Sequence, residues 1–200
     1  VVGTNRDVDV TDMAAVSKAM EVYKPHVVIN CASLSDPGYC EDHVVETFRI
    51  NALGARNIAA ATRSKNAKLI HLSTNEVFSG EHGQAKNEFD FPTPRTVLGK
   101  SKLAGENFVR ELNPKHLIIR SSWNYGGRDG KDDYVAYVLD KAKKGESFTA
   151  PLDLISTPTN TALIADFIEK MLDTQEYGIY HASCEGACTM HEYARSILRY

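Results

Sequence analysis

The sequence predicts a doubly wound α/β fold built on a parallel sheet, and two observations support this prediction. Short runs rich in β-branched residues alternate with longer stretches in which apolar residues recur at helical spacing. The run 26–32 (HVVINCA) is largely apolar throughout, as expected of a strand that is buried on both faces of a sheet. Strands joined by helical crossovers lie parallel, so the alternation predicts βαβ units.

The elements are expected in a regular order along the chain. We expect strands at residues 1–4, 26–32, 68–74, 116–122, near 147–151 and at 178–182. We expect helices after an N-cap at Thr11 or Asp12, at 41–64, 97–112, 133–145 and 161–172, and at the end of the chain. The glycine at the end of the 133–145 stretch is typical of a helix C-terminus.

Composition limits the classes of partner. The 200 residues carry a formal net charge of −3, and the basic residues are scattered, which predicts no nucleic-acid partner and no membrane partner. Cys31 lies in an apolar run and is expected to be a buried thiol, which fits a reducing cytoplasm. Cys184 and Cys188 form no recognisable zinc spacing, so free thiols and no metal site are expected.

The ends of the chain suggest an excerpt of a longer protein. It begins with VVGTNR, without an initiator methionine, and stops inside an amphipathic pattern, ARSILRY. A glycine-rich turn after a first strand, which cradles the pyrophosphate of a dinucleotide, is not found, and YGGRDG follows a late strand instead. We therefore expect that the N-terminal strand–helix unit is missing from this chain.

Candidate site residues follow the carboxyl ends of the expected strands, where open parallel sheets bind their ligands. Ser73 and Thr74 end one strand, and their hydroxyl groups either bind a substrate carbonyl or cap the next turn. Lys102 either holds a nicotinamide ribose and lowers the pKa of a neighbouring phenol, or is a solvated helix lysine. Trp123 and Tyr125 follow another strand and either wall a pocket or belong to the core.

The order of several motifs is more specific than any single residue. The motifs are DVTD, VVINCA, INALGARN, LIHLSTNEVFSG, GKSKLAGE, HLIIRSSWNYG and STPT. Together they resemble the dTDP-4-dehydrorhamnose reductase family, which consists of extended short-chain dehydrogenases/reductases acting on a nucleotide-linked keto-sugar. The resemblance spans essentially all 200 residues. It is weaker to related sugar-nucleotide epimerases and to the regulatory subunit of methionine adenosyltransferase.

The resemblance implies an organisation, a cofactor and a substrate class. Residues 1–146 would form a dinucleotide-binding, Rossmann-like domain that is incomplete at its N-terminus, and residues 147–200 part of a small substrate-binding portion. The implied function is NAD(P)H-dependent reduction of a nucleotide-linked 4-keto-sugar in dTDP-rhamnose biosynthesis, in the cytoplasm. A nucleotide-activated sugar is the implied partner, and a homodimer is considered without being decided by the sequence.

Site roles are implied only where residues match the family pattern. The catalytic residues would be Thr74 and Lys102, and the substrate-binding residues Thr74, Asn75 and Trp123. The implied cofactor contacts are Arg6, Asp9, Val10, Ala32, Ser33, Leu34, Leu72 and Lys102. Arg6 could pair with a 2′-phosphate, which favours NADP over NAD, although a plain surface arginine explains it equally well.

One departure puts the activity in question. The catalytic tyrosine of the family falls on Leu98, four residues before Lys102, and leucine can neither donate a proton nor hydrogen-bond an oxyanion. Two hypotheses follow: a reductase with an altered acid, or a non-catalytic sugar-nucleotide-binding, dinucleotide-binding or regulatory protein. If Leu98 occupies the place of the acid, its side chain should point toward Thr74 and Lys102. The alternative is that it packs beneath the helix.

Overall fold

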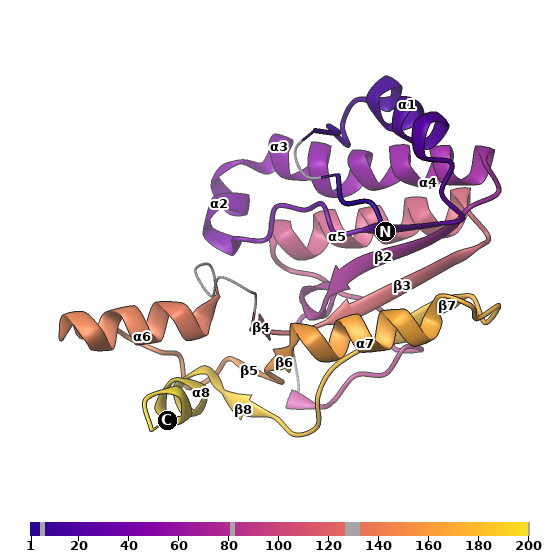
Figure 1. The fold of residues 1–200 in the computed structure, drawn as a ribbon. Helices are drawn as coiled ribbons and strands as arrows, with labels where there is room; N and C mark the ends of the chain where they lie inside the picture. The colour runs from indigo at the N-terminus through magenta and orange to yellow at the C-terminus, as the bar shows by residue number, and fades with distance from the viewer. Residues whose placement is uncertain (5–6, 81–82, 127–132, 200) are drawn as a thin grey trace. The chain divides into compact units, whose positions relative to one another are not determined.

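The computed structural model describes residues 1–4, 7–80, 83–126 and 133–199 (Figure 1). The chain divides into two compact units, which are described separately. The first unit comprises Val1–Ser79, Lys86–Arg120 and Leu172–His181. The second unit comprises Gly80–Ala85, Ser121–Met171 and Ala182–Tyr200. The division predicted at residue 146 concerns binding roles and stays a prediction.

A four-stranded sheet forms the centre of the first unit. Its strands are β1 (Val27–Asn30), β2 (Lys68–Thr74), β3 (His116–Ser121) and β7 (Gly178–His181), in the order β1-β2-β3-β7. The strands β1 and β2 pair in parallel, with Val27 opposite Lys68, and β3 and β7 pair in parallel, with Leu117 opposite Gly178. The sheet confirms the predicted α/β class.

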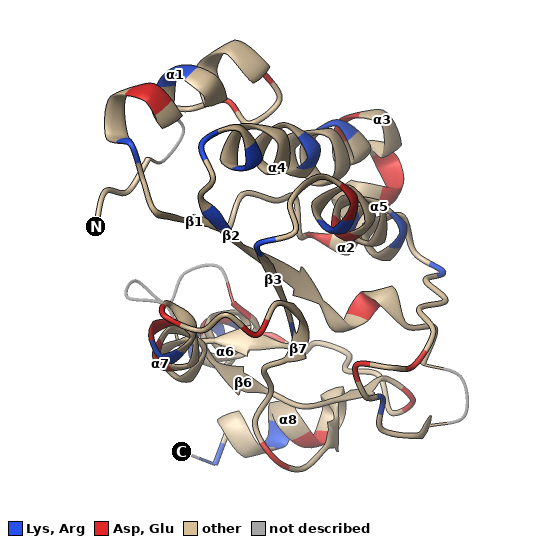
Figure 2. Cartoon of the chain, turned by 90° about the vertical axis from the view of Figure 1, so that its right-hand side faces the viewer, with Lys and Arg blue, Asp and Glu red and all other residues tan. Residues whose placement is uncertain are grey.

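Three longer helices pack on this sheet or on one another. They are α1 (Met13–Tyr23), α4 (Ala55–Ser64) and α5 (Val97–Leu112). Helices α4 and α5 lie side by side along β2, and α1 packs on α4 (Figure 1). Asp12 caps α1 by accepting a hydrogen bond from the backbone N–H of Ala14 at 2.8 Å. Figure 2 shows both basic and acidic residues on α1 and α5, whereas α4 carries basic residues only.

The core of the first unit lies between β2 and the helices that cover it. Ala55, Ala59, Leu69, Val109 and Ile118 are buried in one cluster, with small residues on α4 and large ones on the strands. Burial of each large aliphatic side chain contributes about 1.5–3 kcal/mol to stability. The fold of this unit therefore rests on the apolar faces that the sequence periodicity predicts.

The helix predicted at 41–64 is interrupted once, at His43, and the chain around this break forms four segments. These are α2 (Pro37–Asp42), α3 (Val44–Phe48), a π-helical segment η1 (Arg49–Gly54) and α4. His43 separates α2 from α3 with φ −126° and ψ 53°, outside the helical region. From Val44 onward the chain stays helical through the π turn, a feature that is frequent at functional sites.

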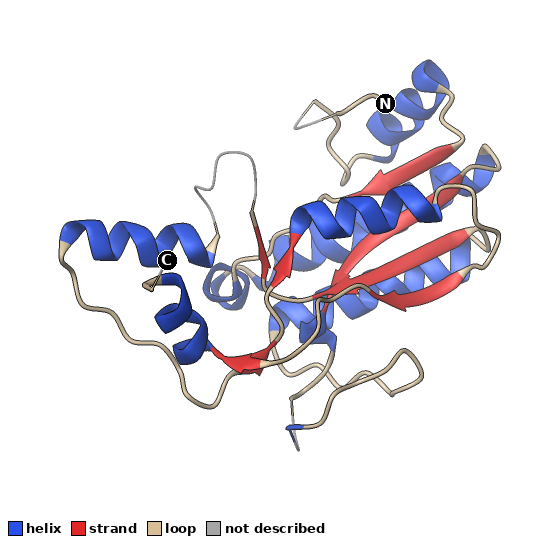
Figure 3. Ribbon diagram, turned by 60° about the horizontal axis from the view of Figure 1, so that its bottom comes forward, coloured by secondary structure: helices blue, strands red, loops and turns tan. Residues whose placement is uncertain are grey.

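Among its described residues, the second unit holds three helices and two short strand pairs, and Figure 3 colours the helices and strands by type. The helices are α6 (Tyr134–Lys144), α7 (Thr161–Met171) and α8 (Met190–Ile197). Strand β4 (Asn124–Tyr125) pairs in parallel with β6 (Thr159–Asn160), and β5 (Ile155–Ser156) pairs in antiparallel with β8 (Cys188–Thr189). Gly145 ends α6 in the left-handed conformation at φ 64°, as its position predicts.

Two predicted strands are wrong. Residues 1–4 and 147–151 have no strand structure. A strand needs a hydrogen-bonding neighbour, and none of the described strands pairs with either segment. No helix within the described ranges combines the length and the apolar character that crossing a bilayer requires.

Candidate functional site

Lys102 is buried at the centre of the candidate site. It lies on α5 with only 5% of its surface exposed, and its Nζ donates a hydrogen bond of 2.6 Å to the carbonyl oxygen of Leu72 on β2. Burial lowers the pKa of Lys102 to about 8, and the carboxylate of Glu106 partly opposes this shift. A solvated helix lysine is therefore excluded, and the cofactor role of Lys102 stays a prediction.

Two hydroxyl groups end β2, and each has a structural partner. Ser73 Oγ donates to Glu106 Oε1 at 2.5 Å. Thr74 Oγ1 accepts a hydrogen bond of 3.2 Å from the backbone N–H of Glu76 and lies 3.3 Å from Asn75 Oδ1. Thr74 thus caps the short 3-10 helix η2 (Asn75–Val77). Capping of the next turn is one of the two roles that the sequence predicts for this hydroxyl. Thr74 is half-buried and holds Asn75 beside it.

A buried ion pair supports this end of the sheet, and sequence reasoning missed it. Glu106 is 1% exposed and Arg120 is 4% exposed. Glu106 also accepts from Ser73, so one carboxylate joins α5 to β2 and β3. The Arg120 guanidinium lies over the ring of Phe78, with 5.1 Å between its Cζ and the ring centroid. The signal that could have revealed the pair is an arginine inside an apolar strand.

The loop after β1 carries three predicted cofactor contacts, Ala32, Ser33 and Leu34. Asn30 Oδ1 accepts from the backbone N–H of Ala32 at 3.0 Å. Asn51, in the π-helical segment, accepts from the Leu34 N–H at 2.8 Å and donates to the Leu34 carbonyl at 2.9 Å. Its side chain therefore fixes both backbone groups of Leu34.

Asn51 also ties this loop to the helix that carries Lys102. Its Nδ2 donates to Ser101 Oγ at 3.0 Å, and Asn51 is 1% exposed. Sequence reasoning did not select Asn51 as a site residue. An amide on the apolar face of the predicted helix was the available signal, because a buried amide needs fixed partners.

His71 lies on β2 beside Asn30, and both are buried. The amide of Asn30 is oriented by its bond to Ala32, so its Nδ2 donates to His71 Nδ1 at 3.0 Å. The neutral imidazole therefore carries its proton on Nε2, an assignment that follows from the hydrogen bonds. Burial, followed by the charge of Lys102, holds the pKa of His71 well below its usual value.

The predicted contacts near the adenine lie in a separate turn before α1. Asp9 accepts hydrogen bonds of 2.8 Å from both the N–H and the hydroxyl of Thr11, and these bonds lower the pKa of Asp9. Val10 packs on the core, and its carbonyl accepts from Asn57 Nδ2 at 3.1 Å. Arg6 lies outside the described residues. The structure thus brings Leu72 and Lys102 together, while Asp9 and Val10 belong to another loop.

The predicted environment of one cysteine is wrong. Cys31 is exposed, because it follows the last residue of β1 and lies in the loop. Cys184 and Cys188 are free thiols of the second unit. Within the described ranges, no three His, Cys, Asp or Glu side chains are arranged to hold a metal ion. The prediction that the protein binds no metal stays a prediction.

Trp123, the predicted substrate wall, belongs to the second unit. It is half-buried, and its backbone has φ 40°, in the left-handed region. Its indole stacks with the ring of Tyr193, with centroids 6.0 Å apart and planes 10° from parallel. The role of Trp123 as a wall of the substrate site stays a prediction.

Leu98 lies in the first turn of α5, one turn before Lys102. Its side chain is buried, with 5% exposed, and its carbonyl accepts from Ser101 Oγ at 2.9 Å. A buried Leu98 fits both a side chain that points toward Thr74 and Lys102 and one that packs beneath the helix, because Lys102 is itself buried to the same degree. Its direction toward Thr74 stays a prediction.

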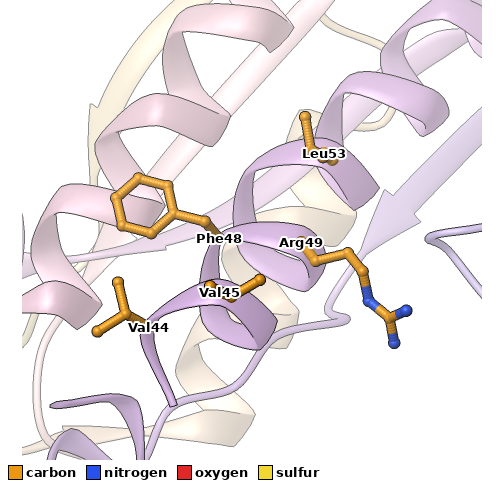
Figure 4. A pocket seen from close by; sticks show the side chains of 5 residues that line it. All are labelled: Val44, Val45, Phe48, Arg49 and Leu53. Carbon is orange, nitrogen blue, oxygen red and sulfur yellow. The ribbon is translucent and has the colours of Figure 1, made fainter. Parts of the chain in front are cut away.

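A hollow of about 430 Å³ lies elsewhere, on α3 and η1 (Figure 4). Its lining residues are Val44, Val45, Phe48, Arg49 and Leu53. None of them is a predicted site residue. The hollow is therefore a surface feature apart from the polar groups around Lys102.

Comparisons with known proteins identify the family of this chain. The family model described as the RmlD substrate binding domain matches residues 1–200. The spore coat polysaccharide biosynthesis protein SpsK of Bacillus subtilis is 32% identical over 195 residues, which cover 98% of this chain and 68% of that protein. The dTDP-4-dehydrorhamnose reductase of Streptomyces griseus is 35% identical, with 96% of this chain and 64% of that protein covered.

Solved structures give the same relationship. A dTDP-4-dehydrorhamnose reductase from Clostridium acetobutylicum is 38% identical, with a TM-score of 0.92 over 97% of this chain and 68% of that chain. A dTDP-4-dehydrorhamnose reductase from Bacillus anthracis, in complex with NADP, is 35% identical, with a TM-score of 0.93 over 98% and 69%. The chain spans about two thirds of the length of these relatives. The family model and the solved structures lead to one conclusion: this chain belongs to the dTDP-4-dehydrorhamnose reductase family.

Proposed function

We propose that the protein containing this chain is an NAD(P)H-dependent reductase of a nucleotide-linked 4-keto-sugar. One observation carries the proposal. Lys102 is buried at the carboxyl end of β2, with its Nζ on the carbonyl of Leu72. Burial of a lysine is unfavourable, so its presence at the end of a parallel strand favours a binding role.

The residues around Lys102 fit a nicotinamide cofactor. The ammonium group has three N–H donors and Leu72 takes one, so donors remain for the hydroxyls of a ribose. The loop 32–34 is fixed by Asn51 next to the same helix. When bound, the cofactor supplies the hydride. The family relative that contains NADP supports a nicotinamide dinucleotide, and Arg6 would favour NADP over NAD.

The remaining assignments concern the substrate and the setting. Thr74 and Asn75 would contact the sugar at the carboxyl end of β2, and Trp123 would provide an aromatic wall for it. Asp9 and Val10 would lie toward the adenine. A nucleotide-activated sugar is the proposed substrate, a homodimer the proposed assembly, and the cytoplasm the proposed location.

Leu98 keeps a second function under consideration. Reduction of a ketone leaves an alkoxide that must be protonated, and general acid catalysis contributes about 10²–10⁴-fold to such a step. Tyr39 and Glu76, two other side chains that could supply a proton, both have hydrogen-bond partners of their own. Tyr39 donates its hydroxyl to Glu46 at 2.8 Å, and Glu76 Oε2 lies 3.4 Å from Thr96 Oγ1. The alternative is a non-catalytic sugar-nucleotide-binding or dinucleotide-binding protein, or a regulatory one.

Restoring the phenol separates the two functions. The full-length protein is first shown to bind NADPH and a dTDP-4-keto-sugar, and Leu98→Tyr is then compared with Leu98→Phe, which adds the same ring without the hydroxyl. A reductase that lacks only its acid should gain about 10²-fold or more in the tyrosine variant alone. If the wild type and both variants bind the two ligands but none of them reduces the sugar, the protein is a binding protein.

The cofactor role of Lys102 has its own test. Titration with NADPH and with NADH, followed by cofactor fluorescence, compares Lys102→Ala with Lys100→Ala, an exposed lysine on the same helix. We expect weaker binding for the Lys102 variant only, because a buried donor to the ribose is lost. Unchanged affinity for the Lys102 variant would remove this residue from the cofactor site.

A further inference from the structure

Six aromatic side chains of the second unit form a continuous cluster. They are Trp123, Tyr125, Tyr134, Tyr137, Phe148 and Tyr193. Tyr193 occupies the middle of the cluster, with ring centroids 6.0 Å from Trp123, 6.2 Å from Tyr125 and 5.6 Å from Tyr134. Within the described ranges, no other ring of the cluster contacts as many neighbours. The placement of the cluster therefore depends on Tyr193.

The backbone of Trp123 has a strained conformation. A φ of 40° lies in the left-handed region, which a residue other than glycine keeps only where its surroundings hold it there. Two contacts hold it here. The Trp123 carbonyl accepts from the backbone N–H of Thr159 at 3.2 Å, and Ser122 Oγ donates to the carbonyl of Thr157 at 2.7 Å. The strand β4, which follows Trp123 directly, pairs with β6.

Tyr193 supports the indole from a capped helix. The residue is 8% exposed and lies on α8, which begins with a capping box formed by Thr189 and Glu192. Its ring lies 10° from parallel to the indole, at a separation typical of an offset stack. Trp123 itself is half-buried, so the stack on Tyr193 does not enclose the whole residue.

We propose that Tyr193 is a positioning residue, whose ring fixes the Trp123 indole so that the indole walls a subsite for the sugar of the nucleotide-linked substrate. The proposal deepens the function proposed above and rests on it. A flat aromatic surface suits the C–H-bearing face of a sugar ring, and a wall that is already fixed loses little side-chain freedom on binding.

The ring of Tyr193, rather than its hydroxyl, performs this role. The hydroxyl oxygen is buried and has no hydrogen-bond partner among the described residues. Burial raises the pKa of Tyr193, so the phenol stays protonated and neutral. An unpaired buried hydroxyl contributes nothing favourable to stability, and its removal should leave the stack intact.

The experiment uses the fluorescence of Trp123, the only tryptophan of the 200 residues. Emission and acrylamide quenching are compared for the wild type, Tyr193→Phe, Tyr193→Leu and the control Tyr137→Leu. Tyr137 belongs to the same cluster and contacts Tyr134 and Phe148. We expect red-shifted emission and stronger quenching for Tyr193→Leu only. Unchanged emission in that variant would overturn the positioning role.

Binding decides the second half of the proposal. The same proteins are titrated with dTDP-glucose and with dTDP, so that contributions of the sugar and of the nucleotide are separated. We expect Tyr193→Leu to weaken binding of dTDP-glucose about tenfold and to leave binding of dTDP unchanged, with Tyr193→Phe like the wild type. Equal losses for both ligands, or no loss, would overturn the sugar wall.

Two further measurements cover the cases in which a variant does not fold or the wild type does not bind the ligands. If Tyr193→Leu does not fold, as judged by circular dichroism, Tyr193→Met replaces it, because methionine fills a similar space without a ring. If the wild type binds neither dTDP-glucose nor dTDP, the proposed function fails and the sugar wall with it. The emission comparison in the free protein still decides whether Tyr193 positions Trp123.

Discussion

Glu106 holds Arg120 through two hydrogen bonds, of 2.9 Å from Nε to Oε1 and 2.6 Å from Nη2 to Oε2. Both side chains are almost fully buried, and the same carboxylate accepts from Ser73, the neighbour of Thr74. A buried pair of this kind depends on both partners, because a single remaining charge has no compensation. The pair thus couples the helix of Lys102 to the strand end that carries the candidate hydroxyls.

Removing the charge of Glu106 should destabilise the protein strongly. In Glu106→Gln the buried Arg120 loses its counter-charge, and we expect the free energy of unfolding to fall by about 3–5 kcal/mol. Urea unfolding measures the change against Glu111→Gln, an exposed glutamate on the same helix, which should change it by less than about 0.5 kcal/mol. Similar losses in both variants would show that the pair adds no special stability.

Cofactor binding through Lys102 should weaken above pH 8. With a pKa of about 8, the amine is charged below that pH and neutral above it. We expect NADPH affinity to fall across pH 8–9 in the wild type. Lys102→Arg keeps its charge throughout this range, so its affinity should stay flat with pH, even if it is lower. Titrations at fixed ionic strength make the comparison, and parallel profiles for the two proteins would contradict the assignment.

His71 should make stability depend on pH below its ordinary pKa. The folded state holds the pKa of His71 well below 6.5, so between about pH 6.5 and 5 the unfolded chain binds a proton that the folded chain does not. Stability should therefore fall as pH falls, by up to about 1.4 kcal/mol per pH unit from this group. His71→Asn should flatten the slope, whereas His26→Asn, at an exposed histidine, should leave it. Urea unfolding at several pH values measures both slopes.

Gly99 should not tolerate a side chain. A Cβ at this position would lie 2.1 Å from the backbone carbonyl oxygen of Glu76, where little can move. Alanine is the better helix former by about 1 kcal/mol, so an unobstructed helical site would be stabilised. We expect Gly99→Ala to lower the melting temperature and Gly38→Ala, whose nearest neighbour would lie 3.4 Å away, not to lower it. Thermal unfolding followed by circular dichroism tests the sign of both changes.

The spacing of apolar residues predicted those elements whose bounds depend on residues within the element itself. The strand at 68–74 and the helix at 97–112 have the predicted bounds, because apolar periodicity and the Thr96 cap act within one element. The strand predicted at 1–4 is absent, since strand formation depends on a neighbour that a single segment does not reveal. The break at His43 was missed for a similar reason, because apolar spacing continues across it.

In the candidate site, too, the sequence predicted single residues but not the partners that they meet in the fold. The sequence indicated Lys102 and Thr74 through their position near a strand end. It gave no indication that Leu72 accepts the bond from Lys102, or that Asn51 holds Leu34, because these partners meet only through tertiary packing. The Tyr193–Trp123 stack joins positions far apart in the chain and was equally inaccessible to periodicity.

Because of the π-helical turn at Arg49–Gly54, the directions of the side chains along this helix depend on the number of residues in the turn. Such a turn accommodates one more residue than an α-helical turn, so the side chains after it are displaced by about 100° around the axis. Deleting one residue from this turn would restore a regular α-helix. The deletion would also rotate Asn51 relative to the rest of the helix, so that its side chain could no longer contact both Leu34 and Ser101. A one-residue deletion here should thus detach the loop 32–34 while leaving the helix intact, whereas a point substitution at Leu53 should not.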